Sequence, residues 1–379
     1  MSRLCIKFVG FVLAILVSDM ASADLSEQLK QIKLPSGFEI SVYAEELGNP
    51  RQMTLGAKGT VFVGNRNGTK VYALVDSNGD NKADKTYVVF DTAALPEEMK
   101  VKMPSGVAFK DGALYIGAIN YIFRLDDIEN NLDDPPKPVI VVDDFPDTAH
   151  HGWRFIAFGP DGKLYVPVGS PCNVCEKDEE IFGTITRINP DGSGREIVAK
   201  GIRNTLGFDW HPKTGELWFT ENGTDGMGDD VPADELNRIT KKGQHFGYPY
   251  VHQGDILDKR FGRDKKIKKY KAPAQNLAPH AAALGMRFYT GDMFPPEYKN
   301  QIFIAEHGSS DRSVKLAYSI TTVFLDDKGK AIAYEPFAEG WLQGDTFWGR
   351  PTDVMQMPDG SLLVSDTDTK AIYRIAYTK

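Results

Sequence analysis

Two adjacent histidines, His150 and His151, are the first candidates for chemistry in this sequence of 379 residues. Imidazole is the side chain that most often acts as a general base near neutral pH. Neighbouring residues of an extended chain point to opposite sides, so we expect only one of the two rings to face a given site. The alternative is a loop histidine without a catalytic role.

Two further segments offer donors for an anionic ligand. Arg203 and Asn204, in the segment 201–207, have fixed N–H donors that suit a carboxylate or an oxyanion. Trp348 and Arg350 lie close together before a predicted strand, and a ring and a guanidinium can flank a planar anion. A planar redox cofactor with several carboxylates would need such arginines, loop oxygens for a metal ion and a histidine over its face.

Two oxygen-rich loops are candidate calcium sites, because Ca²⁺ takes flexible sets of oxygen ligands. The first loop, 221–230, contains Gly223 and Thr224, and its alternative interpretation is an ordinary acidic turn. The second loop, 76–84, partly matches an EF-type calcium loop, but Asn81 stands at position 6 instead of Gly and Tyr87 at position 12 instead of Glu. A structural calcium site and a plain acidic hairpin therefore both stay open. The oxygen side chains of this loop occupy positions 1, 3, 5 and 9 of that pattern: Asp76, Asn78, Asp80 and Asp84.

Cys172 and Cys175 are three residues apart, and we predict that they form a disulfide in an oxidising compartment. A zinc site would need a second pair of ligands with suitable spacing, which the sequence lacks. Attachment of c-type haem would need His where Glu176 stands. A redox-active cysteine pair is the alternative.

Residues 1–23 have the pattern of a secretory signal peptide. Arg3 and Lys7 precede the apolar run 8–17, and small residues follow at 21–23. The run is too short for a membrane-spanning helix, which needs about 20 residues, and nothing later in the chain is apolar for long enough to span a membrane. We therefore expect a periplasmic or secreted protein without a membrane span, in which residues 24–379 form one domain. The net charge of −8 argues against nucleic acid as a partner.

A strand–turn–strand pattern recurs along the chain and must position these loops. Gly, Asp and Pro turns separate alternating β-branched and aromatic residues, as in β-hairpins. Units of this kind about 40–50 residues apart are typical of propeller blades. We predict an all-β, six-bladed β-propeller whose ring is closed by the N-terminal strand 38–44, paired with the last strand, 371–377. The six hairpins are Met53–Val63, Gly106–Gly117, Phe155–Val168, Leu206–Thr220, Met286–Glu306 and Val354–Ser365.

From Leu34 to Tyr377 the sequence resembles the soluble glucose/sorbosone dehydrogenases, and most closely their sorbosone dehydrogenase-like branch. The similar segments are His150–Gly162, Gly169–Glu176, Gly201–Asn204, Asn222–Thr224, Asp234–Asn237, Phe246–Pro249, Ala305–Ser309 and Trp348–Pro351.

The resemblance implies a six-bladed quinoprotein with pyrroloquinoline quinone (PQQ) and Ca²⁺, which oxidises an aldose or a related sugar or aldehyde. It implies that His150 is the general base, that Arg203 and Asn204 contact the quinone, and that backbone carbonyls at Gly223 and Thr224 hold calcium. The base would remove a hydroxyl proton at C1 of the sugar while hydride passes to the quinone, with Arg203 and calcium polarising the quinone carbonyl. The implied electron acceptor is a periplasmic cytochrome or a quinone.

The cofactor-binding arginines depart from the family pattern. Arg350 matches, but Pro351 and Thr352 stand where a second arginine is expected. The family's lysine position falls near residues 305–308, and we expect Arg312, or else Lys315, to replace it.

Two other classes of function remain open from the sequence. A calcium-dependent lactonase would need acidic side chains around the channel and no quinone. A non-catalytic binding propeller would need neither a base nor cofactor arginines, so His150 with Arg203 and Asn204 counts against it. The calcium loops alone do not separate the lactonase from the dehydrogenase.

Overall fold

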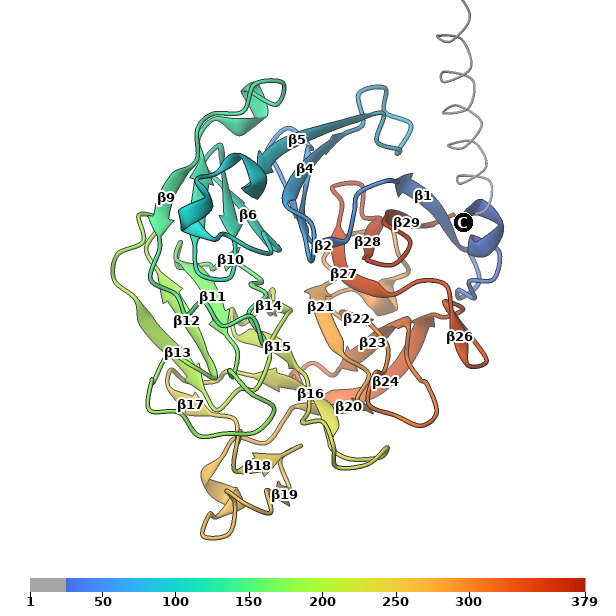
Figure 1. The fold of residues 1–379 in the computed structure, drawn as a ribbon. Coiled ribbons are helices and arrows are strands. Elements are labelled where there is room, and N and C mark those ends of the chain that lie inside the picture. The colour runs from blue at the N-terminus through green and yellow to red at the C-terminus, as the bar shows by residue number, and fades with distance from the viewer. Residues whose placement is uncertain (1–24, 379) are drawn as a thin grey trace, which may run out of the picture.

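Six small antiparallel sheets stand around a central channel in this computed structural model, which describes residues 25–378 (Figure 1). The predicted signal peptide, 1–23, lies outside the described residues. The prediction of an all-β, six-bladed propeller is confirmed. None of the helices among residues 25–378 has the length and apolar character that a membrane crossing requires.

The first three blades follow one another along the chain. Blade 1 consists of β2 (Pro50–Leu55), β3 (Val61–Asn65), β4 (Lys70–Val75) and β5 (Lys85–Asp91). Blade 2 consists of β6 (Gly106–Lys110), β7 (Ala113–Gly117), β8 (Ile122–Leu125) and β9 (Val139–Val142). Blade 3 consists of β10 (Ala157–Phe158), β11 (Leu164–Val168), β12 (Thr184–Ile188) and β13 (Glu196–Lys200), to which the short β17 (Gln244–His245) adds in parallel.

The remaining blades include the closure of the ring. Blade 4 consists of β14 (Phe208–Trp210), β15 (Leu217–Glu221), β16 (Ala233–Arg238) and β20 (Gln275–Pro279). Blade 5 consists of β21 (Ala283–Phe288), β22 (Ile302–Glu306), β23 (Ser319–Leu325) and β24 (Ala331–Ala338). Blade 6 consists of β27 (Pro351–Gln356), β28 (Leu362–Asp366), β29 (Ala371–Tyr377) and β1 (Phe38–Ala44).

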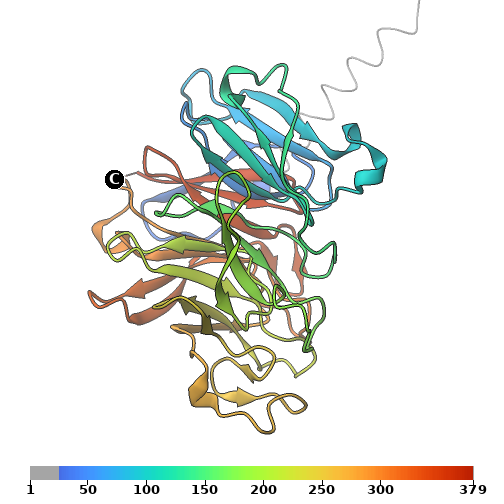
Figure 2. The same ribbon diagram turned by 90° about the vertical axis from the view of Figure 1, so that its left-hand side faces the viewer.

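Short elements decorate the ring. The insertion in blade 4 forms the hairpin of β18 (Val251–His252) and β19 (Ile256–Leu257), which projects from the edge of the ring (Figures 1 and 2). A second hairpin pairs β25 (Leu342–Gln343) with β26 (Thr346–Phe347). Single 3₁₀ turns are η1 (Thr92–Ala94), η2 (Glu97–Met99), η3 (Ile128–Asn130), η4 (Ile267–Lys269) and η5 (Pro296–Tyr298).

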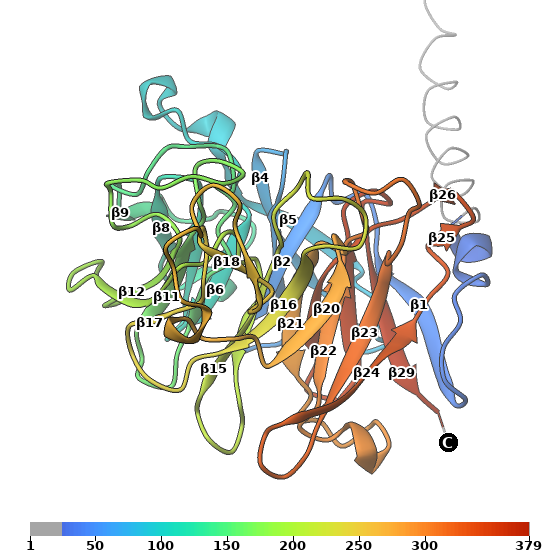
Figure 3. The ribbon, with the colours of Figure 1, turned by 90° about the horizontal axis from the view of Figure 1, so that it is seen from below.

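The N-terminal strand closes the ring as predicted. β1 runs antiparallel to β29, with Phe38 opposite Tyr377 and Val42 opposite Tyr373 (Figure 3). The last blade therefore takes its outer strand from one end of the chain and its three inner strands from the other. This pairing removes the free edge that an open ring would expose.

Hydrophobic clusters between neighbouring blades form the core. The second strand of each blade is buried along its whole length, because its two faces pack against different blades. The described residues contain six such clusters, one for each pair of neighbouring blades. The ring is thus held by apolar packing on both faces of every sheet.

Polar side chains join the inner strands around the channel. Buried Gln52 accepts hydrogen bonds from the backbone N–H groups of Val107 and Ile156, at 3.1 and 2.9 Å, and donates to the Ile156 carbonyl at 2.6 Å. One side chain therefore links blades 1, 2 and 3. At Gly207 the strands approach so closely that a Cβ atom would lie 2.0 Å from the Leu284 carbonyl oxygen.

Candidate active site

The loops that hold most of the predicted site residues meet at one end of the channel. Each inner strand begins at this end and its neighbour ends there, as the pairs Pro50–Asn65, Ala283–Glu306 and Pro351–Asp366 show. His150, Arg203 and Arg350 precede inner strands, whereas Gly223 and Thr224 follow a second strand. We call this end of the channel the mouth.

The two histidines lie together at the mouth, not on opposite sides of the chain. Their ring centroids are 4.0 Å apart, so the expectation that the rings point in opposite directions is wrong. The reason is local: His151 has a φ of 53°, in the left-handed region, and the segment is not extended. His151 is buried and His150 is exposed.

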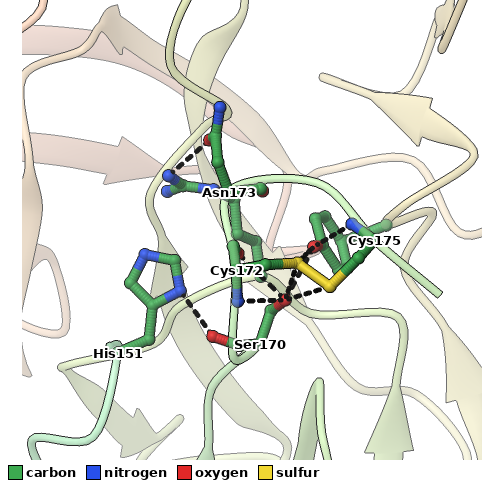
Figure 4. Close-up of a disulfide and its surroundings, with 7 residues drawn as sticks. His151, Ser170, Cys172, Asn173 and Cys175 are labelled. Carbon is green, nitrogen blue, oxygen red and sulfur yellow. Dashed lines mark hydrogen bonds between the residues drawn. A yellow bond between two sulfur atoms is a disulfide. The ribbon is translucent and has the colours of Figure 1, made fainter. Parts of the chain in front are cut away.

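The hydrogen bond of His151 determines which of its ring nitrogens is free. Its Nδ1 lies 2.8 Å from the carbonyl oxygen of Ser170, which can only accept, so Nδ1 carries the hydrogen (Figure 4). In the neutral ring Nε2 is then the free base. Burial, with smaller contributions from Arg203 and His150, lowers the pKa of His151 to about 3, which keeps the ring neutral. Burial and Arg203 also lower the pKa of His150.

Arg203 is almost fully bonded to the protein. Its guanidinium donates to the backbone and side-chain oxygens of Asn173 at 3.1 and 2.9 Å, to the Asn222 carbonyl at 3.3 Å and to Asp225 at 2.7 Å. Four of its five N–H groups are thereby used, and one remains for a ligand. Asn204, which is buried beside it, donates from Nδ2 to the Asn222 side chain at 3.1 Å.

Three arginines gather around Trp153 and the Arg350 loop. The guanidinium carbons of Arg51 and Arg66 lie 5.5 and 4.9 Å from the Trp153 ring. Arg350 donates to the carbonyls of His307 and Gly308, both at 3.0 Å. Arg51 comes from β2 and Arg66 directly follows β3, about 300 residues before Arg350 in the chain. We call Arg51, Arg66 and Arg350 the arginine cluster.

The arginine cluster has donors without partners. Nη1 of Arg51 and Nε of Arg66 are buried and have no hydrogen-bond acceptor within residues 25–378. Burial, together with Arg66 and Arg350, lowers the pKa of Arg51 to about 9. Burial and Arg350 likewise lower the pKa of His307, which lies in the segment where the family's lysine is expected. The nearby Asp353 carboxylate opposes the shift at Arg51. Three neighbouring positive charges with unpaired buried donors favour an anionic ligand.

Sequence reasoning missed Arg51, Arg66 and Trp153 and assigned similar roles to other residues. Trp348 packs against Trp341 and Tyr373, with ring centroids 6.0 and 6.5 Å away, and donates to the Gly340 carbonyl at 2.8 Å. Its ring therefore belongs to the packing of blade 6, while Trp153 lies beside the arginine cluster. Arg51 lies two residues before the predicted strand that begins at Met53 and within the observed β2, so the sequence prediction gave no signal for it.

Arg312 is near the mouth but is bound to the loop of blade 4. Its guanidinium donates hydrogen bonds to the Asp229 carbonyl and, at 3.1 Å, to the Val314 carbonyl. Its Nη2 also lies 3.8 Å from a carboxylate oxygen of Asp230. Ser313, its neighbour, binds the Asp229 carboxylate. These contacts fasten the 307–318 loop to the 222–232 loop, and they occupy Arg312 with protein partners.

The first predicted calcium loop has carbonyl oxygens available. Thr224 is buried, and the backbone oxygens of Gly223 and Thr224 accept no hydrogen bond within the described residues. Nearby, one ligand atom from each of Asp225, His280 and Asp311 lies within 4.8 Å of the other two. The mouth therefore offers oxygen donors for a cation next to Arg203.

The second predicted calcium loop lies at the opposite end of the ring. It joins β4 to β5 where Val75 pairs with Lys85, the end away from Asn65. Its carboxylates bind their own backbone: Asp76 accepts from the N–H groups of Gly79 and Asn81 at 2.7 and 2.8 Å. In the same way, the side-chain oxygens of Asn78, Asp80 and Asp84 accept from the backbone N–H groups of Asp80, Lys82 and Ser77, respectively. These contacts are internal to the hairpin, and a cation bound there would lie far from the mouth.

A buried acid beside the mouth makes folding stability depend on pH. Burial raises the pKa of Glu306 to about 7, although Tyr334, Thr321 and Ser319 all donate to its carboxylate. Between about pH 4.5 and 7 the folded chain then holds a proton that the unfolded chain has lost, so stability decreases as pH rises through this window.

We therefore expect Glu306→Gln to flatten the decrease in melting temperature of the ligand-free protein between pH 5 and 7.5. Thermal unfolding at several pH values measures this, with the exposed Glu97→Gln as the control. An unchanged pH profile in Glu306→Gln would mean that Glu306 is ionised in the fold.

Comparisons with known proteins agree with this architecture. The model of the family described as glucose/sorbosone dehydrogenase matches residues 122–374. An uncharacterised protein of Borreliella burgdorferi is 34% identical over 364 residues, covering 92% of this chain and 91% of its own. A Trichoderma reesei structure of carbohydrate-active enzyme family AA12 has a TM-score of 0.78 at 18% identity, over 92% of this chain and 97% of that one. The PQQ domain of a Coprinopsis cinerea pyranose dehydrogenase, in its holo form, has a TM-score of 0.75 at 16% identity, over 91% and 97%. At these identities the two structures show similarity of fold.

Proposed function

Because this chain belongs to the glucose/sorbosone dehydrogenase family, we propose that it is a quinoprotein sugar dehydrogenase that works at the channel mouth. The observation that carries the proposal is the arginine cluster with its unpaired donors, at the same end of the channel as a buried histidine whose Nε2 is free. A binding propeller would need neither feature.

The residues of the mouth fit PQQ, a planar quinone with three carboxylates. Arg51, Arg66 and Arg350 would hold carboxylates, and Trp153 offers an aromatic face beside them. The family's second arginine is missing from the segment after Arg350. Arg51 and Arg66 would supply its positive charge instead. When bound, the quinone accepts the hydride of the substrate.

We propose His151 as the general base, in preference to the neighbouring His150 that the sequence predicted. The Ser170 carbonyl holds Nδ1–H of His151, so Nε2 would accept the hydroxyl proton of the substrate. Burial and, to a smaller extent, the positive charge of Arg203 lower the pKa of His151, and an anionic ligand beside Arg203 would raise it toward the working pH.

Arg203, Asn204 and the 222–225 loop complete the proposed site. The one free N–H of Arg203 would donate to a ligand oxygen, and Asn204 supports the same loop. Free carbonyls at Gly223 and Thr224 suit Ca²⁺, a cation that prefers oxygen ligands. Calcium there would polarise a ligand oxygen as a Lewis acid.

The substrate we propose is an aldose or a related sugar or aldehyde, with sorbosone-type substrates included. The proposed electron acceptor is a periplasmic cytochrome or a quinone. Residues 1–23 would direct the chain to the periplasm or the medium and be removed there. The lactonase is a weaker candidate, because an arginine cluster has no part in calcium-assisted hydrolysis of a neutral lactone.

We expect the chain from Asp24, purified without cofactor, to reduce a dye with sugar only when PQQ and Ca²⁺ are both added. A chelator should abolish the reaction. A panel of aldoses, ketoaldehydes and alcohols would identify the substrate, and a panel of lactones without PQQ serves as the comparison. Lactone hydrolysis with no binding of PQQ would favour the lactonase over the quinoprotein dehydrogenase.

A further inference from the structure

The disulfide between Cys172 and Cys175 lies in a loop of the mouth that the proposed chemistry does not use. The predicted bond is present, with the two Cα atoms 6.2 Å apart, in the connection from β11 to β12 (Figure 4). The bond closes a ring of four residues that contains Asn173. Both cysteines are half-buried, and Cys175 with Ser170 lines a surface pocket.

This loop contacts the proposed base on one side. The Ser170 carbonyl accepts from Nδ1 of His151 at 2.8 Å, and it is the contact that leaves Nε2 free. The approach is close: a Cβ atom on Gly169 would lie 2.6 Å from the Cβ atom of His151. A small displacement of the loop would therefore change the contact with His151.

The same loop contacts the arginine on the other side. Asn173 accepts from Arg203 with its backbone oxygen at 3.1 Å and with its side-chain oxygen at 2.9 Å. Asn173 also donates to the Asp225 carbonyl at 2.9 Å and accepts from the Asp225 N–H at 3.0 Å. One loop thus orients the base, the arginine and the start of the proposed calcium segment.

Besides the disulfide and the contacts of Asn173, hydrogen bonds to neighbouring loops hold this segment: the Ser170 N–H donates to the Arg203 carbonyl at 2.8 Å. The Ser170 hydroxyl lies 3.4 Å from the sulfur of Cys172 and 2.7 Å from the hydroxyl of Tyr248, which accepts from the Cys175 N–H at 3.0 Å. Residues 169–183 contain no strand. The covalent bond therefore restricts a segment that has no sheet pairing to restrict it.

We propose that the Cys172–Cys175 disulfide is the positioning element for His151 and Arg203, and that its reduction lowers turnover while the propeller stays folded. Reduction by dithiothreitol breaks the S–S bond and gives two thiols, taking two electrons and two protons from the reagent, which closes to its own disulfide. The effect on turnover rests on the proposed function, whereas the effect on the His151 ring does not.

The first measurement follows the ring of His151 without any cofactor. In protein labelled with ¹⁵N-histidine, long-range ¹H–¹⁵N spectra distinguish a protonated from an unprotonated ring nitrogen, and His151→Gln identifies the signals among the seven histidines. We expect one tautomer, with hydrogen on Nδ1, in the oxidised protein, and exchange between tautomers after reduction or in Cys172→Ser/Cys175→Ser. An unchanged His151 spectrum in the reduced protein would overturn the proposal.

The second measurement follows turnover. We expect kcat to fall at least tenfold on reduction, with a smaller change in PQQ affinity, and to recover on reoxidation of the wild type but not of the serine variant. Circular dichroism should show an intact fold throughout. Unchanged kcat beside a changed His151 spectrum would also overturn the proposal.

Asn173→Ala is the matched variant, because it keeps the disulfide and the Ser170 carbonyl but removes the side-chain contact with Arg203. Its His151 spectrum should be that of the oxidised wild type, while its kcat falls. If no form of the protein reduces a dye, the proposed function fails, and the spectra of His151 still decide the positioning role.

Discussion

His151→Ala is expected to lower kcat by about 10²- to 10⁴-fold while PQQ binding persists. That range is typical for removal of a general base. The variant removes the nitrogen that the Ser170 carbonyl leaves free but none of the arginines that would hold the cofactor. Steady-state dye reduction with saturating PQQ and Ca²⁺ measures kcat, and a fluorescence titration measures cofactor affinity.

His150→Ala is the matched control, since the two rings are 4.0 Å apart and differ in burial. We expect it to retain turnover within a few-fold of the wild type. The reverse result, with a large loss in His150→Ala and a small one in His151→Ala, would return the role of base to His150 and contradict the assignment from the hydrogen bond.

Arg51→Met is expected to weaken PQQ binding roughly 10- to 100-fold and to stabilise the ligand-free protein. A hydrogen bond between charged partners contributes about 1.5–3 kcal/mol, which corresponds to the loss of affinity. Without ligand, the cost of burying Arg51 and its repulsion by Arg66 and Arg350 outweigh its attraction to Asp353, as its lowered pKa shows, so its removal relieves a net unfavourable charge. Titration with PQQ and thermal unfolding with and without PQQ measure the two opposite effects.

Arg260→Met provides the control for loss of one positive charge, because Arg260 is exposed in the insertion of blade 4. It should change neither PQQ affinity nor the melting temperature. If Arg51→Met instead lowered the stability of the ligand-free protein and left PQQ affinity intact, Arg51 would be a structural residue, and the carboxylates would have to bind elsewhere.

The sequence by itself determined the ring and its closure. Turn residues between alternating β-branched and aromatic residues specify hairpins locally, and the six predicted hairpins coincide with the inner two strands of the six blades. The strand 38–44 could be assigned to the last blade because a ring of sheets cannot leave an open edge. Local chemistry also indicated the disulfide, since cysteines three residues apart lie within reach of each other.

Only the tertiary structure decided which side chains share the mouth. Arg51 and Arg66 meet Arg350 because blade 6 is followed around the ring by blade 1; ring closure implies that adjacency, but no local pattern shows which side chains then come together. The positive φ of His151 turned two rings to the same side where an extended chain would have separated them. Residue types and spacings predict local backbone, but the partners of a long side chain depend on segments that come together only when the ring closes.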